Sequence, residues 1–252
     1  MLNIGDYVTR ISYDNDILFE IIDIKDDNYI LKGVSVRLYA DSPKNDLLIC
    51  KQTEDSDNFI PCIDEYRDLD RNEYFYLPGI VLHLDGDKDY LDKCMKFYKK
   101  NKIRSYGLFV REEEMPLKVF ALLKKYNPDI LVLTGHDSFS RNKRDKYKNT
   151  SSFVDSVIEA RKFEKSHDKL FIIAGACQSN YEDLIKAGAN FASSPKRINI
   201  HALDPAVVAS CLSFSNKNED IDIIKILDKT KYGADGMGGI ITKGSMYIGY
   251  PR

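Results

Sequence analysis

The sequence predicts a small all-β region followed by a larger α/β region built on a mostly parallel sheet. Its 252 residues, at about 150 per domain, give room for one large domain or for one with a small companion. The first fifty residues alternate between apolar and polar, which is typical of half-buried strands. Farther along, short and nearly continuous apolar runs alternate with amphipathic segments, as in parallel sheets covered on both faces.

The amino-terminal region, residues 1–53, is predicted to form a small β-barrel of the SH3-like type. Clusters of Asp and Asn, which favour turns, separate its alternating runs. A small sheet protects its edges best by closing on itself, so we expect a barrel. The predicted strands cover residues 7–11, 18–22, 29–32 and 34–39.

Residues 54–75 are predicted to be a linker, because they are rich in acidic residues and hold neither a helical nor a strand period for long. Residues 76–252 then form the α/β region. Its predicted strands are 80–84, 106–110, 130–133 and 170–174. Its predicted helices are 88–101, 116–126, 151–164, 180–187, one capped by Asp204 and one near 219–229. A terminal hairpin is expected in the glycine-rich tail.

Charge and cysteine usage narrow the class of function. The 37 basic and 39 acidic side chains leave a net charge of −2, which disfavours a general nucleic-acid binder. No apolar stretch is long enough for a membrane span, and the start MLNIGDYVTR lacks an export signal, so we expect a soluble cytosolic protein. The five cysteines contain no CxxC pair, which predicts reduced thiols and neither a disulfide framework nor a zinc site.

Polar residues follow three of the predicted strands and should meet at one edge of the sheet. Asp85 and Asp87 follow the first strand, His136 the third and Cys177 the fourth. A cysteine acts as a nucleophile only as a thiolate, and a nearby imidazole can lower its pKa. His136 and Cys177 therefore form a candidate catalytic dyad, if the third and fourth strands are neighbours. The alternative is a buried Cys177 that packs like alanine and a His136 satisfied by hydrogen bonds.

Main-chain N–H groups near Asp137 and Cys177 are the predicted oxyanion donors for such a dyad. Gly135 and Gly175 precede the two reactive residues and permit sharp exits from the strands. No metal or other cofactor is expected.

Three long strings carry a family resemblance: VLHLDGDKDYL, GHDSFSRN and FIIAGACQSNYEDLIKAGANFASSPKRINIHALDP. On these residues the chain resembles the YabG family of sporulation-specific proteases, from its IGDYV start to the terminal GMGGI. More distantly, it is similar to the caspase, clostripain and gingipain type of cysteine protease, so the resemblance implies a caspase-like domain. Ala176-Cys177 fits that type, whereas His136 is followed by Asp137 instead of glycine.

The resemblance implies an endopeptidase that cleaves spore coat and related proteins after arginine and also processes itself. It implies an enzyme in the cytoplasm of the sporulating cell, associated with the developing coat. An arginine pocket needs a carboxylate, because an unpaired buried guanidinium is unfavourable. Asp85 and Asp87 are the leading candidates for substrate binding, and ordinary turn chemistry is their alternative role. The basic run 141–148, Arg67 and Arg71 are candidate self-cleavage points.

Two other functions stay open from the residues alone. Asp85-Gly86-Asp87 after a strand, with Thr134 after a later one, fits a magnesium-dependent phosphatase of the haloacid-dehalogenase type. Such an enzyme needs further carboxylates after the fourth strand, where this chain has Cys177. Alternatively, the amino-terminal barrel docks on coat components and the α/β region is a scaffold without catalytic activity.

Overall fold

A computed structural model describes residues 2–25, 28–50, 74–140 and 146–249. The chain divides into two compact units, Met1–Ile60 and Pro61–Arg252. Most of the predicted linker lies outside the described residues, so the predicted domain limits stay predictions. Within the described ranges, no helix has both the length and the apolar character to cross a membrane.

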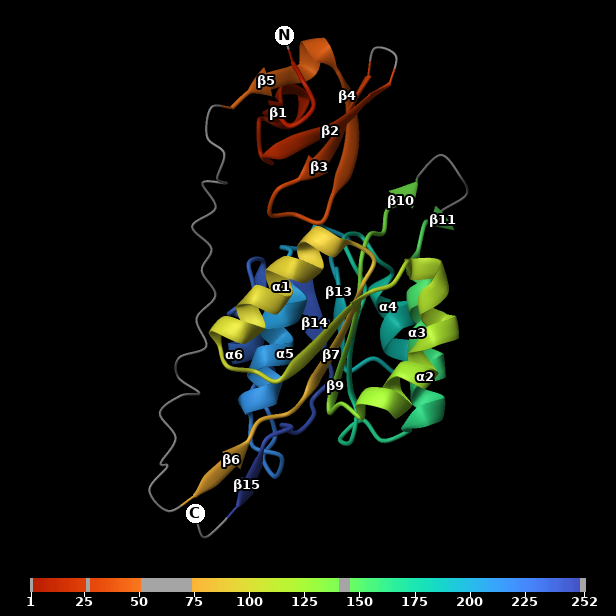
Figure 1. Ribbon diagram of the computed structural model, residues 1–252, viewed down its shortest axis with the longest axis vertical. Coiled ribbons are helices and arrows are strands. Elements are labelled where there is room, and N and C mark those ends of the chain that lie inside the picture. The colour runs from red at the N-terminus through yellow and green to blue at the C-terminus, as the bar shows by residue number, and fades with distance from the viewer. Residues whose placement is uncertain (1, 26–27, 51–73, 141–145, 250–252) are drawn as a thin grey trace. The chain divides into compact units, whose positions relative to one another are not determined.

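The smaller unit is a five-stranded antiparallel sheet with strand order β4-β3-β2-β1-β5 (Figure 1). Alternation along the strands buries one set of side chains, among them Val8, Phe19 and Leu31. β4 and β5 lie at opposite edges of this order, and the predicted closed barrel is not confirmed. The predicted strand at 34–39 is wrong, because the fourth strand begins only at Tyr39. The strands are β1 Tyr7–Arg10, β2 Phe19–Lys25, β3 Asn28–Gly33, β4 Tyr39–Pro43 and β5 Leu47–Ile49.

The larger unit is built on a six-stranded sheet with order β14-β13-β12-β9-β7-β8. All of its pairings are parallel except that of β14 with β13, so the predicted mostly parallel sheet is confirmed. The four predicted apolar runs form β7, β8, β9 and β12, and the short β13 was not predicted. The strands are β7 Val81–Asp85, β8 Ser105–Phe109, β9 Ile130–Thr134, β12 Phe171–Ala174, β13 Phe191–Ser193 and β14 Met237–Gly239.

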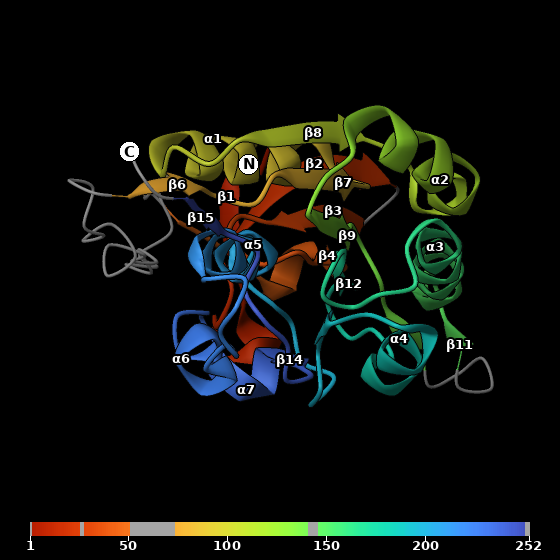
Figure 2. The same ribbon diagram turned by 90° about the horizontal axis from the view of Figure 1, so that it is seen from below.

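Helices cover both faces of this sheet, with α2, α3 and α4 on one side and α1, α5 and α6 on the other (Figures 1 and 2). Alternation along β7 shows why. Leu82 and Leu84 join the core under α2 and α3, while His83 points the other way and meets Tyr98 on α1. The helices are α1 Lys88–Lys100, α2 Met115–Tyr126, α3 Thr150–Phe163, α4 Tyr181–Ala187, α5 Asp204–Phe214, α6 Ile223–Leu227 and α7 Gly233–Gly236.

Two helix predictions need correction. α5 starts at Asp204 itself, whose carboxylate accepts from the N–H groups of His201 and Lys231 and does not cap the helix. The carboxylate therefore ties two loops together. The helix expected near 219–229 is only five residues long, because Asp222 caps it late at Ile223.

The predicted terminal hairpin is wrong, because the two strands of the tail pair with different partners. β14 adds to the large sheet, whereas β15 (Tyr247–Gly249) pairs with β6 (Phe75–Leu77). Gly239 permits the first pairing, since a Cβ there would lie 2.5 Å from the Phe191 ring. A further two-stranded ribbon, β10 (Phe139–Ser140) with β11 (Lys146–Tyr147), follows β9.

The strand order places a topological switch at β7. The chain passes from β7 to β8 on one side of it and then returns to β9 on the other. In open α/β sheets such a switch leaves a crevice at the carboxyl ends of the strands. The segments that follow β7, β8, β9 and β12 all reach this edge.

Candidate active site

His136 and Cys177 follow neighbouring strands in matching register. β9 and β12 are parallel, with Leu133 opposite Ala174, and each candidate residue lies three positions beyond that pair. The strand adjacency on which the proposed dyad depends is therefore confirmed. The catalytic roles themselves stay predictions.

The carboxylate of Asp137 connects the His136 segment to the Cys177 segment. Its Oδ1 accepts from the main-chain N–H of Ser138 and, at 2.8 Å, from that of Asn149. Its Oδ2 accepts from the hydroxyls of Thr150 and, at 2.9 Å, of Ser179. Ser179 Oγ also accepts from Ala176 N at 3.0 Å. Because one buried carboxylate joins both segments, their relative position is fixed by more than the sheet.

The thiol of Cys177 lies under the segment that contains Ile200. The residue is fully buried, its Sγ accepts from Ile200 N at 3.2 Å, and the thiol donates to Ile200 O at 3.7 Å. Ser194 supports this cover, because its hydroxyl donates to Ile198 O at 2.6 Å. A peptide carbonyl can reach the sulfur only after this cover moves.

Cys94 and Cys211 are buried in the core and are best explained as structural residues. Burial raises the pKa of the Cys211 thiol to about 12. Cys94 is also buried and donates to Ala202 O at 3.3 Å. Cys50, Cys94, Cys177 and Cys211 are all free thiols, and Cys62 lies outside the described residues. Cys177 alone among these four follows a sheet strand at the edge that carries His136.

Two carboxylates lie against the His136 imidazole. Asp87 Oδ2 is 3.6 Å from Nε2, and Glu112 Oε1 is 3.8 Å from Nδ1. Glu112 Oε1 also accepts from His136 N at 2.7 Å. Burial acts to raise the pKa of Glu112, but its interactions with His136 outweigh that effect and leave the pKa below its ordinary value.

Asp85 and Asp87, the predicted substrate-binding residues, have different surroundings. Asp85 is fully buried, accepts from Asp87 N at 2.9 Å, and lies 3.5 Å from Nε2 of His83. Asp87 is 5% exposed, and its Oδ1 caps α1 by accepting from the N–H groups of Asp89 and Tyr90. Asp87 therefore lies against His136, whereas Asp85 lies against His83 inside the core.

Gly135 and Gly175, which precede His136 and Cys177, are glycine for different structural reasons. Gly175 has a φ of +105°, which confirms the sharp exit expected there. A Cβ on Gly135 would instead lie 2.3 Å from Glu112 Oε1, so this glycine makes room for a carboxylate. Gly86 does the same from β7, with a corresponding distance of 2.2 Å.

The hydrogen bonds narrow the choice of oxyanion donors. The N–H groups of His136, Ala176 and Gln178 donate within the fold. The N–H of Asp137 makes no hydrogen bond to any part of the chain that the structure describes. This arrangement is compatible with the predicted donors at Asp137 and Cys177, which stay a prediction.

Glu112 and Ile200 belong to the site but were not predicted from the sequence. Glu112 begins a run of three acids that resembles an ordinary acidic first turn before α2. Its position soon after the second predicted strand of the α/β region was the available signal. Ile200 gave no signal, because its contact with Cys177 depends on how the segment after β13 folds back.

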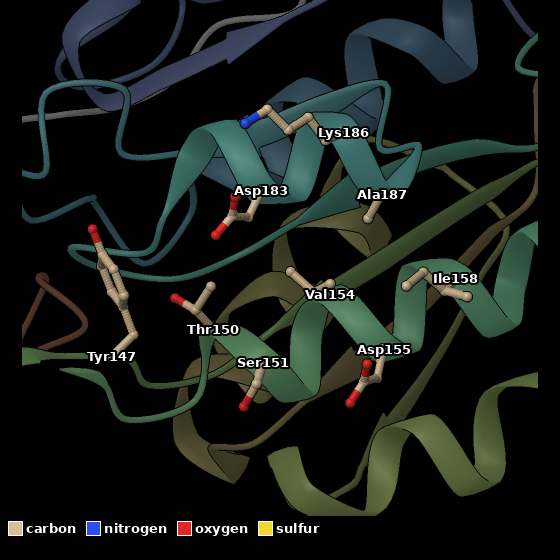
Figure 3. Close-up of a pocket in the computed structure, with 9 residues that line it drawn as sticks. All are labelled: Tyr147, Thr150, Ser151, Val154, Asp155, Ile158, Asp183, Lys186 and Ala187. Atoms are coloured by element: carbon tan, nitrogen blue, oxygen red, sulfur yellow. The ribbon is translucent and has the colours of Figure 1, made fainter. Parts of the chain in front are cut away.

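A groove of about 590 Å³ lies beside this site, between α3 and α4. Figure 3 shows Val154 pointing from α3 toward α4 and Asp183 pointing from α4 toward α3. Thr150 belongs both to the groove and to the contacts of Asp137. Its lining residues are Tyr147, Thr150, Ser151, Val154, Asp155, Ile158, Asp183, Lys186 and Ala187.

Comparison with known proteins decides the family. The model of the family described as YabG peptidase U57 matches residues 3–68 and 62–251. The chain belongs to the YabG peptidase family. The sporulation-specific protease YabG of Bacillus subtilis (strain 168) is 42% identical over 282 aligned residues, which cover 98% of this chain and 97% of that protein. The resemblance seen in the sequence is thereby confirmed, and the edge with His136 and Cys177 is a candidate peptidase site.

Membership of the YabG peptidase family also weighs against the phosphatase. A phosphatase nucleophile at Asp85 would have to reach a phosphate ester, yet this carboxylate is fully buried and already accepts a hydrogen bond from Asp87. Thr134, its expected phosphate-binding partner, is fully buried as well. The YabG family and the geometry both favour peptide-bond hydrolysis.

Proposed function

We propose that this chain is a sporulation-specific cysteine endopeptidase in which Cys177 is the nucleophile and His136 the general acid and base. The observation that carries the proposal is the matching register of the two residues beyond β9 and β12. The α/β unit that holds them has the mostly parallel sheet expected of the caspase-like type. Proteins are the substrates that a peptidase family implies.

The reaction follows from the chemistry of this pair. The Cys177 thiolate attacks the scissile carbonyl, and main-chain N–H groups near Asp137 and Cys177 stabilise the oxyanion. The C–N bond then breaks as His136 transfers its proton to the departing amine. Water, deprotonated by His136, next attacks the thioester carbonyl and releases the thiolate. The segment around Ile200 must move first, because it covers the sulfur.

Cleavage after arginine, self-processing and a role on the spore coat are parts of the same proposal. The relative from Bacillus subtilis, a sporulation-specific protease by name, supports the link to sporulation. The arginine pocket remains predicted at Asp85 or Asp87, although each already has a partner within the fold. Arg67, Arg71 and most of the basic run 141–148 lie outside the described residues.

Substitution of the two reactive residues tests the proposal. Cys177→Ala and His136→Ala should each lower cleavage of a coat-protein substrate by at least about 1,000-fold with unchanged circular dichroism. Cys211→Ala is the matched control, because it removes an equally buried thiol outside the site. Full activity in either of the first two variants would contradict the proposal.

Chemical labelling locates the nucleophile and tests the arginine preference together. An arginyl chloromethyl ketone should modify Cys177 and leave Cys94 and Cys211 untouched in peptide maps. An excess of an arginyl peptide should protect Cys177. Labelling of another cysteine, or protection by a glutamyl peptide alone, would reject the assignment.

A further inference from the structure

The register between β9 and β12 ends just before the two proposed catalytic residues. Leu133 and Ala174 are its final pair, and the N–H of Gly175 donates to Leu133 O at 3.0 Å. Gly175 then turns the chain out of the sheet with a φ of +105°. His136 and Cys177 both lie beyond this point. Their relative position therefore depends on side-chain contacts as well as on the sheet.

The carboxylate of Asp137 supplies such contacts from the β9 side. Its Oδ1 accepts from two main-chain N–H groups, and its Oδ2 accepts from the hydroxyls of Thr150 and Ser179. An ionised carboxylate only accepts hydrogen bonds, and four donors match the capacity of its two oxygens. Asp137 is buried, so water competes little for these bonds and each is stronger than it would be at the surface.

Each of the two hydroxyls continues the connection to the segment that contains Cys177. Ser179 Oγ accepts from Ala176 N at 3.0 Å, directly before the proposed nucleophile. Thr150 Oγ1, at the start of α3, accepts from Asn180 N at 3.1 Å. Asn180 in turn caps α4. The carboxylate therefore reaches both ends of the turn between β12 and α4.

The same carboxylate also holds the segment of His136. Asn149 donates through Nδ2 to His136 O at 2.7 Å and through its main-chain N–H to Asp137 Oδ1 at 2.8 Å. The N–H of Ser138 donates to the same oxygen at 2.9 Å. The main-chain N–H groups of Asp137 and Cys177 are the predicted oxyanion donors. The network thus joins the backbone of both donors.

We propose that Asp137 is a positioning residue, whose side chain, through Thr150 and Ser179, sets the relative position of the His136 and Cys177 segments and of their oxyanion donors. This inference rests on the proposed cysteine-peptidase function and adds three side chains to it. In this role the carboxylate transfers no proton and forms no bond to the substrate. Oxyanion donors stabilise the transition state more than the bound peptide, so the network should affect kcat much more than KM.

Steady-state kinetics of peptide cleavage test the proposal. Ser179→Ala and Thr150→Val each remove one hydroxyl from Asp137 and should each lower kcat about 10-fold, with KM nearly unchanged, because small misplacements near the reacting atoms are costly. Thr150→Ser keeps the hydroxyl and should keep kcat close to that of wild type. Ser156→Ala is the matched control, since it removes a fully buried hydroxyl that donates to Ser152 O within α3. It should change neither constant.

The double variant distinguishes one shared network from two independent effects. Because both hydroxyls act through one carboxylate, Ser179→Ala combined with Thr150→Val should lower kcat by clearly less than the product of the single losses. Asp137→Asn turns one acceptor oxygen into a donor and should resemble the double variant. Strictly additive losses, unchanged kcat in both single variants, a rise in KM alone, or an equal loss in Thr150→Ser would each overturn the inference.

Hydrogen exchange followed by mass spectrometry separates this inference from the proposed function. In full-length Cys177→Ala protein, Asp137→Asn should speed exchange at the N–H of Ala176, because the Ser179 hydroxyl that accepts from it is no longer held. Unchanged exchange there would refute the role of Asp137 even in an active enzyme. Activity that survives Cys177→Ala would refute the proposed function without altering this exchange.

Discussion

Two carboxylate–imidazole pairs lie at almost the same separation in this unit. His83 lies within β7 and Asp85 at its end. Nε2 of His83 is 3.5 Å from Oδ2 of Asp85, and both side chains are 0% exposed. His136 and Asp87 are 3.6 Å apart beyond the strand ends, and they are 16% and 5% exposed. The first pair is closed off from solvent, whereas the second is partly exposed at the edge of the sheet that carries the candidate site. On the proposed mechanism, the position of each imidazole relative to the sheet, and not the chemistry of its pair, separates the structural His83 from the catalytic His136.

Alanine substitution of the two histidines gives the sharpest test of this comparison. His136→Ala should lower peptide cleavage by about 1,000-fold and leave the free energy of unfolding nearly unchanged. His83→Ala should do the reverse, because it removes the imidazole that contacts both Asp85 and Tyr98 in the core, at a cost of about 3 kcal/mol. Urea unfolding and peptide cleavage, measured on both variants, provide the result. Equal losses of activity would remove the distinction between the pairs.

Asp85 is expected to matter for stability. Asp85→Ala should lower the free energy of unfolding by about 3 kcal/mol, because it removes both the charge opposite His83 and the acceptor of Asp87 N. Asp85→Asn keeps that acceptor and should lose less. Urea denaturation compares the two, and a fully stable Asp85→Ala variant would show that the buried pair contributes little.

The hydroxyl of Tyr98 should have a smaller effect. It lies 3.0 Å from Nδ1 of His83 inside the core. Tyr98→Phe keeps the ring and removes this hydrogen bond, so we expect a loss of about 1 kcal/mol in urea unfolding. Cleavage should not change, and a selective loss of activity would tie His83 to catalysis after all.

The ionisation of Glu112 should make the free energy of unfolding depend on pH. Its pKa in the fold is below the ordinary value of 4.5, so the ionised form stabilises the native state. That contribution is complete above about pH 4.5 and is lost as the pH falls through the lowered pKa. Glu112→Gln should therefore be less stable than wild type at pH 7, with a gap that narrows at pH 3. A gap that widens on acidification would contradict this.

The exposed pair of Glu114 and Lys118 should show the smallest effect. It spans one turn at the start of α2, and both side chains are about half exposed. Glu114→Gln should change the free energy of unfolding by no more than about 0.5 kcal/mol, and less in high salt. A larger loss in urea unfolding would indicate that the turn carrying Glu112 depends on this pair.

Local patterns predicted the parts of the fold that local forces decide. The four apolar runs of the α/β region became β7, β8, β9 and β12. β7, β9 and β12 are buried along their whole length, as expected of strands covered on both faces, whereas β8 lies at the edge of the sheet and is partly exposed. Short strands were harder. β13 has three residues and no distinguishing pattern, and the two strands of the tail joined different sheets because pairing depends on distant partners.

The apolar runs alone showed which candidate site residues follow a strand: Asp87, His136 and Cys177 each come after a run that hydrophobic burial makes a strand. Which of these strand ends lie together became clear only from the folded chain. The order β12-β9-β7-β8 brings Glu112 and Asp87 to His136, and the return of the chain after β13 lays Ile200 over Cys177. Periodicity reports how each segment is buried, whereas strand order follows from packing among all segments at once.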